Sequence, residues 1–231
     1  MSGTVKGGRI SVIIVDDHEV VRLGLRTLLA AVQSIELVGE AASGRAAVAR
    51  VKELSPDIVV MDLAMPRLNG VEATRQILRE NPAVKIIALS SYSDLDHVQQ
   101  AIAAGACGYL LKGMAPGDLI KALFEVHRGH RYFSPSIAER LLEQHMPLKP
   151  ADHAVQTDLS IGEAEVLQLI AEGMANKQIA QELNLSIKTI EKRRQSLMGK
   201  LDLHTVADLV RYAISRKTIE EACVEEAQED A

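Results

Sequence analysis

Cysteine is scarce in this sequence, since only Cys107 and Cys223 occur among its 231 residues. Two cysteines are too few for a disulfide framework or a cysteine-based metal site, and neither lies in a context that marks a catalytic thiol. Long apolar runs are missing as well, because none approaches the ~18 residues that suggest a membrane span. Residues 1–9 also lack the apolar core of a signal peptide. We therefore expect a cytoplasmic protein that does not enter a membrane.

Charge of one sign is concentrated at one end of the chain. The net charge is -5, and residues 219–231 contain six acidic and no basic side chains, a composition typical of a disordered tail. Without this tail the chain has a net charge of -5 + 6 = +1. Residues 186–201 hold five basic side chains and one acidic side chain, Glu191. A basic segment of helix length favours a nucleic-acid partner despite the negative total.

Between residues 10 and 130, apolar runs of strand length alternate with stretches of helical period. Strands that alternate with helices form a parallel sheet with helices on both faces and right-handed crossovers. We therefore predict an α/β fold in which a five-stranded doubly wound sheet occupies residues 9–130. The predicted strands are Ile10 to Val15, Ile35 to Ala41, Ile58 to Asp62, Val84 to Leu89 and Gly108 to Leu111.

The second half of the chain has neither a strand pattern nor an internal repeat. Residues 131–157 are rich in proline and predict a partly helical linker. Residues 158–218 predict a second, all-α domain of four helices, which begins with a capping box formed by Ser160 and Glu163. Two of its helices are joined by a tight turn and form a helix-turn-helix.

Acidic side chains follow two strands of the predicted sheet. Asp16 and Asp17 come directly after the first strand, and Asp62 ends the third. A doubly wound sheet places these strands side by side and binds ligands at their carboxyl ends. Clustered carboxylates repel one another, and Mg²⁺, which accepts carboxylate and phosphate oxygens, would neutralise them. Taken alone, Asp16 also suits a helix cap, and Asp17 a first-turn acid that interacts with the helix dipole.

Two further polar groups stand at the carboxyl ends of strands, Ser90 after the fourth and Lys112 after the fifth. A metal site, a hydroxyl, an ammonium and a strand-end carboxylate are the groups that phosphoryl transfer to Asp62 requires. Separately, Ser90 is typical of a turn and Lys112 of a solvated surface, but their joint appearance favours the phosphoacceptor site. A haloacid-dehalogenase-type phosphatase uses similar groups but needs a second Asp two residues after the nucleophile, where this chain has Ala64.

The strand-end residues belong to four short sequence blocks. These are Val15-Asp16-Asp17-His18, Met61-Asp62-Leu63-Ala64-Met65-Pro66 with Asn69-Gly70, Ala88-Leu89-Ser90-Ser91, and Gly108-Tyr109-Leu110-Leu111-Lys112. In order and spacing the blocks resemble those of two-component receiver domains, and the resemblance covers about residues 9–130.

The resemblance implies that Asp62 accepts a phosphoryl group from a sensor histidine kinase. It implies no enzyme activity beyond Mg²⁺-dependent phosphorylation and dephosphorylation of the protein itself. Ser90 and Lys112 would contact the phosphoryl group, and Tyr109 would turn inward when Ser90 moves. Without the resemblance, Tyr109 is an ordinary core or surface aromatic. The implied Mg²⁺ ligands are Asp17, Asp62 and the backbone carbonyl of Ala64, with Asp16 acting through water.

The predicted third helix of the all-α domain has cations on one side. Ile190, Leu197 and Leu201 recur at helical period and are expected to face the core. The opposite side suits the major groove of double-stranded DNA, and the helix N-terminus with Ser186 can hold a phosphate. A solvated basic face is the alternative. The expected DNA-contacting residues are Ser186, Lys188, Thr189, Glu191, Lys192, Arg193, Arg194 and Gln195.

A second resemblance concerns residues 159–213. Their landmarks are Glu165-Val166-Leu167, Gly173, Asn176-Lys177, Ile179-Ala180, Lys188-Thr189-Ile190 and Lys200-Leu201. These residues are similar to LuxR-type domains, and the two halves together resemble response regulators of the NarL/FixJ subfamily. In that family Gly162 usually corresponds to a charged residue, and Arg193 to a His or Tyr. Glu191 places an acid in the recognition helix, where it would accept from a cytosine N4 or repel phosphate.

The two resemblances predict a DNA-binding transcriptional regulator of a two-component system that is controlled by phosphorylation. Phosphorylation is expected to free the helical domain or to pair two copies of it into a homodimer. A receiver that acts only through protein partners and an RNA-binding antiterminator are the rival classes. An apolar stripe predicts the dimer surface, with an ordinary helical core as its alternative. The stripe consists of Val206, Leu209, Val210 and Ala213.

Overall fold

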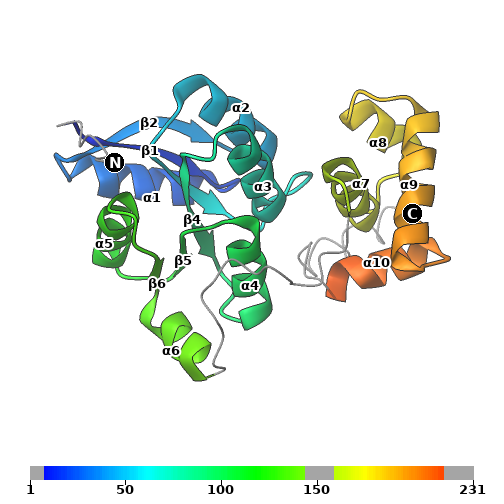
Figure 1. The fold of residues 1–231 in the computed structure, drawn as a ribbon. Coiled ribbons are helices and arrows are strands. Elements are labelled where there is room, and N and C mark those ends of the chain that lie inside the picture. The colour runs from blue at the N-terminus through cyan, green and yellow to red at the C-terminus, as the bar shows by residue number, and fades with distance from the viewer. Residues whose placement is uncertain (1–7, 144–158, 216–231) are drawn as a thin grey trace.

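The structure is a computed structural model that describes residues 8–143 and 159–215. The first of these ranges forms a parallel sheet with helices on both faces, and the second contains helices only (Figure 1). Within the two ranges, no helix combines the length and the apolar character needed to cross a membrane. The linker residues 144–157 and the acidic tail 219–231 lie outside the described residues.

The sheet has six parallel strands in the order β2-β1-β3-β4-β5-β6. The predicted doubly wound sheet is confirmed, and β1 and β3 lie side by side as expected. A strand of two residues, β6, extends the sheet beyond the five predicted strands. The strands are β1 (Ile10–Val15), β2 (Ile35–Ala41), β3 (Ile58–Asp62), β4 (Lys85–Ser90), β5 (Gly108–Leu111) and β6 (Tyr132–Phe133).

Helices cover both faces of the sheet, which explains why its central strands are apolar on both sides (Figure 1). Two helices pack on one face through Leu25, Leu29, Leu119 and Leu123. Three pack on the other face, and a fourth packs against α4. The first face carries α1 (Glu19–Ala30) and α5 (Pro116–His127), and the second carries α2 (Gly44–Leu54), α3 (Gly70–Glu80) and α4 (Leu95–Ala104), with α6 (Pro135–Glu143) beside it.

The sixth strand and α6 fall within the segment predicted as a linker. Tyr132 and Phe133 pair with β5, and Ile137 and Leu141 of α6 are buried in the same core as α4. The guanidinium of Arg140 also donates to the carbonyl of Ser93 in the loop before α4. The folded unit around the sheet therefore continues past residue 130 and includes the helical part of the expected linker.

The C-terminal part is a four-helix domain, as predicted. Its helices are α7 (Ile161–Ala171), α8 (Asn176–Glu182), α9 (Ile187–Leu201) and α10 (Val206–Ser215). The predicted capping box is present, because the Glu163 carboxylate accepts from the backbone N–H of Ser160 at 2.7 Å. The turn between α8 and α9 is made by Asn184, whose φ of 52° is left-handed. Asparagine tolerates that conformation better than most residues, so the helix-turn-helix has a local cause.

The prediction of an exposed apolar stripe on α10 is wrong for two of its four residues. Leu209 and Ala213 are fully buried and belong to the core of the helical domain, and Val210 packs partly against that core. Only Val206 is well exposed, at 40%. The helical period of these residues therefore serves the core formed by α7 and α10, which was the alternative interpretation of the pattern.

Candidate functional site

Asp62 is a fully buried carboxylate at the end of the central strand β3. Its Oδ1 accepts from the backbone N–H of Ala64 at 3.2 Å, and its Oδ2 accepts from the ammonium of Lys112 at 2.9 Å. The first residue of α3, Gly70, packs directly against the backbone of Asp62. A Cβ added to Gly70 would lie 1.9 Å from the carbonyl oxygen of Asp62, so this position requires glycine.

A single ammonium joins two buried carboxylates at this edge of the sheet. Lys112, after β5, lies 2.9 Å from an oxygen of Asp62 and 2.9 Å from an oxygen of Asp16, and both acids are 0% exposed. Burial raises the pKa of Asp62 to about 6; the hydrogen bond from Lys112 opposes this rise and the charge of Asp16 adds to it. Burial lowers the pKa of Lys112, but the two carboxylates outweigh this effect and raise it. The site therefore has more negative charge than its lysine balances.

The acidic residues fit a divalent cation. Ligand atoms of Asp16, Asp17, His18 and Asp62 all lie within 4.8 Å of one another. Asp16 Oδ2 and Asp17 Oδ1 are buried oxygens that accept no hydrogen bond from the described residues. Lys112 and the exposed His18 ring stand at ion-pair distance from them. Carboxylate oxygens carry several lone pairs, so buried oxygens that face one ammonium and one imidazole can still bind a metal such as Mg²⁺. Sequence reasoning overlooked His18, although its position next to the two acids was visible.

Ser90 and Tyr109 are connected through the loop after β4. Ser90 is fully buried, and its hydroxyl accepts from the backbone N–H of Tyr92 at 3.1 Å. The hydroxyl of Tyr109 donates to the carbonyl of the same Tyr92 at 2.8 Å, and burial raises the pKa of Tyr109 to about 12. Tyr109 thus already points inward, at 1% exposure. A displacement of Ser90 would act directly on the residue that holds Tyr109.

The loop between β3 and α3 contacts the helical domain, and the most buried partner in this contact is an amide that sequence reasoning also missed. Gln168 of α7 is 1% exposed. Its Oε1 accepts from the backbone N–H of Asn69 at 3.0 Å, and its Nε2 donates to the carbonyl of Met65 at 3.1 Å. Glu172, the residue that follows α7, accepts from the Gln168 side chain and from the backbone N–H of Arg67. We call these hydrogen bonds the Gln168 contact.

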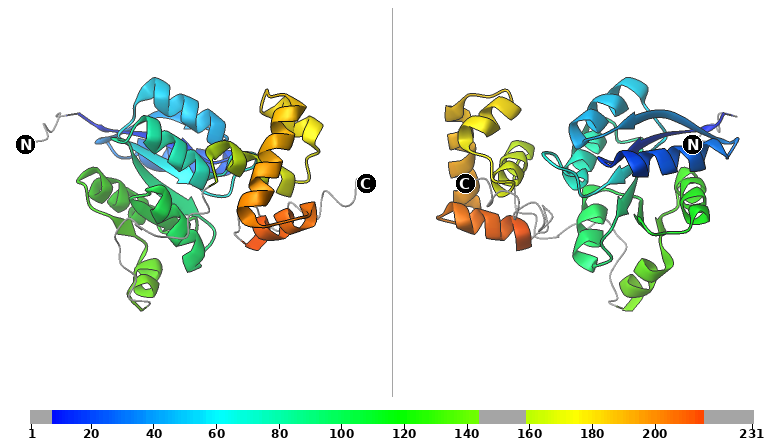
Figure 2. Two further views of the ribbon diagram at one scale, coloured as in Figure 1. Left: turned by 45° about the vertical axis from the view of Figure 1, so that its right-hand side comes forward. Right: turned by 180° about the vertical axis from the view of Figure 1, so that it is seen from behind.

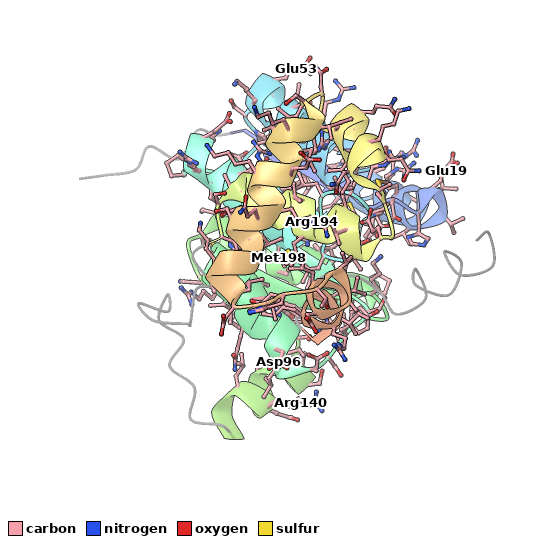
Figure 3. All side chains as sticks on the ribbon, turned by 90° about the vertical axis from the view of Figure 1, so that its right-hand side faces the viewer. Glu19, Glu53, Asp96, Arg140, Arg194 and Met198 are labelled. Atoms are coloured by element: carbon pink, nitrogen blue, oxygen red, sulfur yellow. The ribbon has the colours of Figure 1, made fainter. Side chains whose placement is uncertain are left out.

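The recognition helix α9 lies on the side of the helical domain that faces away from the sheet (Figures 1 and 2). A view onto this side shows α9 in front (Figure 3). Most of the residues expected to contact DNA are exposed, and Thr189, Arg193 and Arg194 are half-buried. The hydroxyl of Ser186 accepts from the backbone N–H of Thr189 and caps the helix. The exposed residues of the expected set are Ser186, Lys188, Glu191, Lys192 and Gln195.

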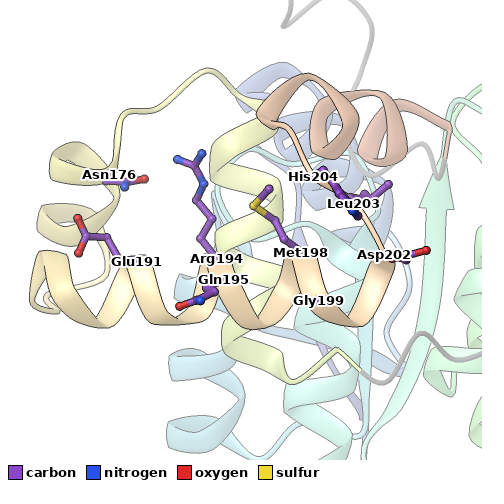
Figure 4. Close-up of a pocket in the computed structure, with 9 residues that line it drawn as sticks. All are labelled: Asn176, Glu191, Arg194, Gln195, Met198, Gly199, Asp202, Leu203 and His204. Carbon is purple, nitrogen blue, oxygen red and sulfur yellow. The ribbon is translucent and has the colours of Figure 1, made fainter.

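Two arginines of the expected DNA-contacting set, Arg193 and Arg194, are half-buried and have neighbours within the helical domain. The guanidinium of Arg193 lies over Gly162 on α7, where an added Cβ would be 2.6 Å from its Cζ. The two departures from the family pattern therefore compensate each other, because the missing side chain at position 162 makes room for the arginine. Arg194 lines a shallow pocket together with Asn176 and Met198, and Glu191 and Gln195 of the expected set line the same pocket (Figure 4).

Family comparisons agree with this geometry. The profile of the response regulator receiver domain matches residues 12–124, and that of bacterial regulatory proteins of the luxR family matches residues 157–213. The response regulator UvrY of Escherichia coli strain K12 is 38% identical over 206 residues, which are 89% of this chain and 94% of that protein. The chain belongs to the response regulators. The response regulator protein VraR of Staphylococcus aureus is 35% identical over 211 residues, 91% of this chain and 99% of that protein.

This response regulator is also similar to solved structures that contain DNA. One is RcsB from Salmonella enterica serovar Typhimurium bound to a promoter in the presence of the phosphomimetic BeF3-, with a TM-score of 0.56 and 33% identity over 89% of this chain and 98% of that one. Another is an RcsB–DNA complex, with a TM-score of 0.56 and 32% identity over 90% and 99% of the two chains. The predicted NarL/FixJ-type combination of a receiver and a LuxR-type domain is confirmed. Its family consists of transcription regulators that bind DNA.

Proposed function

We propose that Asp62 is the phosphoacceptor of this response regulator. A carboxylate oxygen of Asp62 attacks the phosphorus of a phosphohistidine on the sensor kinase, the P–N bond breaks, and the released imidazole takes a proton. The observation that carries this assignment is the ammonium of Lys112, 2.9 Å from both Asp16 and Asp62. It provides a positive charge beside the attacking oxygen, where the charge of the transferred group accumulates. The protein would promote only its own phosphorylation and dephosphorylation.

The remaining polar groups have separate tasks. Asp17, Asp62 and the carbonyl of Ala64 would hold Mg²⁺, with Asp16 acting through water, and the bound ion would neutralise negative charge on the phosphoryl oxygens. Lys112 would keep the transferred group by moving from the free carboxylate to a phosphoryl oxygen. Ser90 would give up the hydrogen bond from Tyr92 and donate its hydroxyl to the phosphoryl group. The loop that holds Tyr109 would then shift.

The Gln168 contact is the proposed route from the receiver to the helical domain. A phosphoryl group adds about 1.5 to 2 negative charges to Asp62. The loop of residues 63–69 begins at this carboxylate and ends at α3, and its backbone supplies the partners of Gln168 and Glu172. A new position of the loop breaks these hydrogen bonds and releases α7. The conformational equilibrium of the two domains then changes by the ~1–3 kcal/mol usual for allosteric coupling.

The freed helical domain would bind double-stranded DNA with α9 in the major groove, as two copies on a two-fold site. Support comes from a solved structure that its authors describe as two RcsB dimers bound to two parallel DNAs. The exposed residues of α9 would make these contacts, while Arg193 supports the helix from its half-buried position over Gly162. Since Leu209 and Ala213 are buried, Val206 is the part of the expected stripe that remains for a dimer contact. Action on DNA places the protein in the cytoplasm.

Asp62→Asn tests this function. The full chain is incubated with a small-molecule phosphodonor and Mg²⁺, and covalent phosphate and binding to DNA fragments are measured. The wild type is expected to incorporate phosphate and to bind DNA more tightly afterwards, and Asp62→Asn to do neither. The control is Asp57→Asn, because Asp57 precedes β3 at the opposite edge of the sheet and accepts from Ser11. If Asp62→Asn still incorporates phosphate and then binds DNA more tightly, the proposal is wrong.

A further inference from the structure

The recognition helix begins with an apolar side chain that faces solvent. Ile187 is the first residue of α9 and is 46% exposed, whereas Ile190 and Leu197 of the same helix are fully buried. Ile187 belongs to none of the hydrophobic clusters of the described residues and is not packed against them. Single exposed hydrophobic residues are common, so the exposure alone decides nothing. The position of Ile187 at the N-terminus of α9 is what gives its exposure a meaning.

Ile187 lies among charged side chains that have no partners in the part of the chain that the structure describes. Lys188 follows it, and Glu191 stands one turn further on the same side. Within residues 8–143 and 159–215, neither has a hydrogen bond or an ion pair. Figures 1 and 2 show that the described receiver does not cover α9. In helix-turn-helix proteins, the N-terminal residues of the recognition helix are the ones that meet base edges.

We infer that Ile187 is a specificity-determining residue that contacts the 5-methyl group of a thymine. The inference rests on the proposed function, in which α9 enters the major groove. An isoleucine can neither donate nor accept a hydrogen bond, and phosphates offer it no favourable contact. Among the four bases, only thymine presents an apolar group to the major groove. A branched apolar side chain at the tip of the helix therefore matches a thymine.

Glu191 restricts where this thymine lies. Four residues advance an α-helix by about 6 Å, and successive bases of one strand are about 3.4 Å apart. The base that Glu191 meets is therefore one or two base pairs from the thymine that Ile187 meets. A carboxylate accepts from the N4 amino group of cytosine. The preferred site should contain a thymine and a cytosine at this spacing in each half.

Removing single methyl groups from the DNA tests the inference. The full chain, treated with a phosphodonor, selects duplexes from a random pool, and each thymine of the selected site is then replaced by deoxyuridine. Dissociation constants are measured for the wild type, Ile187→Ala and Ile187→Val. At one thymine position in each half-site, replacement by deoxyuridine should weaken wild-type binding about fourfold, which is the effect of losing one buried methyl-sized group. The same replacement should leave the affinity of Ile187→Ala unchanged. For Ile187→Val it should weaken binding nearly as much as for the wild type.

Lys188→Ala is the matched control from the next position. It should weaken binding to all duplexes and keep the discrimination between thymine and uracil. If Ile187→Ala discriminates as the wild type does, or if no thymine responds, the inference is wrong. It is also wrong if Ile187→Ala reduces only the cooperative binding of two copies, which would make Ile187 a protein contact. If the wild type selects no duplex, the DNA-binding role of α9 fails first, and this inference with it.

Discussion

The receiver site and the recognition helix use charged residues in opposite ways. At the end of β3, Asp16 and Asp62 are fully buried, and Lys112 holds both at 2.9 Å. On α9, Lys188, Glu191 and Lys192 are exposed, and no interaction within the described residues fixes them. A small ligand can be met by a site that the fold assembles in advance, because its few atoms need set distances. A long polyanion is met by groups that stay hydrated until it arrives.

The sharpest test of the preassembled site is Lys112→Ala. Without the ammonium, Asp16 and Asp62 repel each other in a buried position, a change that costs ~3 kcal/mol or more for buried pairs. We expect the free energy of unfolding at pH 8 without divalent cations to fall by about this amount, and Mg²⁺ to recover more of it in the variant than in the wild type. Urea denaturation with and without Mg²⁺ measures both effects.

Lys85→Ala is the control, because its ammonium donates to the carbonyl of His127 without bridging two acids. It should lower stability much less and show no added response to Mg²⁺. Equal stability of Lys112→Ala and the wild type in the absence of divalent cations would mean that the buried pair is not held by this lysine.

The second test concerns the side of α9 that packs on α7. Glu163 of α7 accepts from Ser196 at 2.6 Å and from Lys200 at 2.7 Å, and so holds α9 from beneath. Burial opposes ionisation of Glu163, but the hydrogen bonds from Lys200, Ser196 and Ser160 prevail and lower its pKa from 4.5 to about 2. This difference corresponds to at most ~3 kcal/mol of stability.

Glu163→Gln should therefore destabilise the helical domain at pH 7 by up to ~3 kcal/mol. A lowered folded-state pKa stabilises the protein above the unfolded-state pKa, so the contribution is complete above pH 4.5 and lost as the pH falls towards about 2. In denaturation experiments, the difference in the free energy of unfolding between the wild type and Glu163→Gln should shrink as the pH falls from 4.5 towards about 2. Glu191→Gln, on the free side of α9, should be as stable as the wild type at both ends.

The third test asks whether the two regions communicate through the Gln168 contact. Gln168→Ala removes two hydrogen bonds to the loop after Asp62, and one such bond contributes ~1 kcal/mol. We expect unphosphorylated Gln168→Ala to bind DNA about fivefold more tightly than the wild type, and the two phosphorylated proteins to bind alike. Gln181→Ala changes an exposed glutamine on α8 and serves as the control. Unaltered DNA binding of Gln168→Ala in both states would exclude this route.

Sequence patterns predicted the receiver site better than the contact between the domains, for a physical reason. Strand ends are local features, so Asp16, Asp62, Ser90 and Lys112 could be placed at one edge once the alternation of strands and helices was recognised. Gln168 and Asn69 meet across 99 positions, and no periodicity marks a glutamine that bonds to a distant backbone. The strand β6 has two residues, too few to show an alternating pattern.

The apolar stripe of α10 shows the opposite limit. Its helical period was evident, but period alone does not tell whether a stripe faces the core of its own domain or a second copy. Leu209 and Ala213 face the core because α10 packs on α7. The DNA contact expected of Arg193 stays a prediction, but its position over Gly162 was not foreseen, because the empty space there becomes visible only when α7 and α9 are placed together.

The smallest expected effect belongs to the exposed side of α9. If Lys192 neutralises one phosphate, Lys192→Ala should lower the slope of log affinity against log salt concentration by about 0.9 and weaken binding to all sequences alike. Lys52→Ala on α2, whose side chain is 75% exposed, should leave the slope unchanged. A variant that loses affinity without a change in slope would show that Lys192 reads a base or supports the helix. In that case the exposed charges of α9 would be more specifically placed than their lack of partners among the described residues suggests.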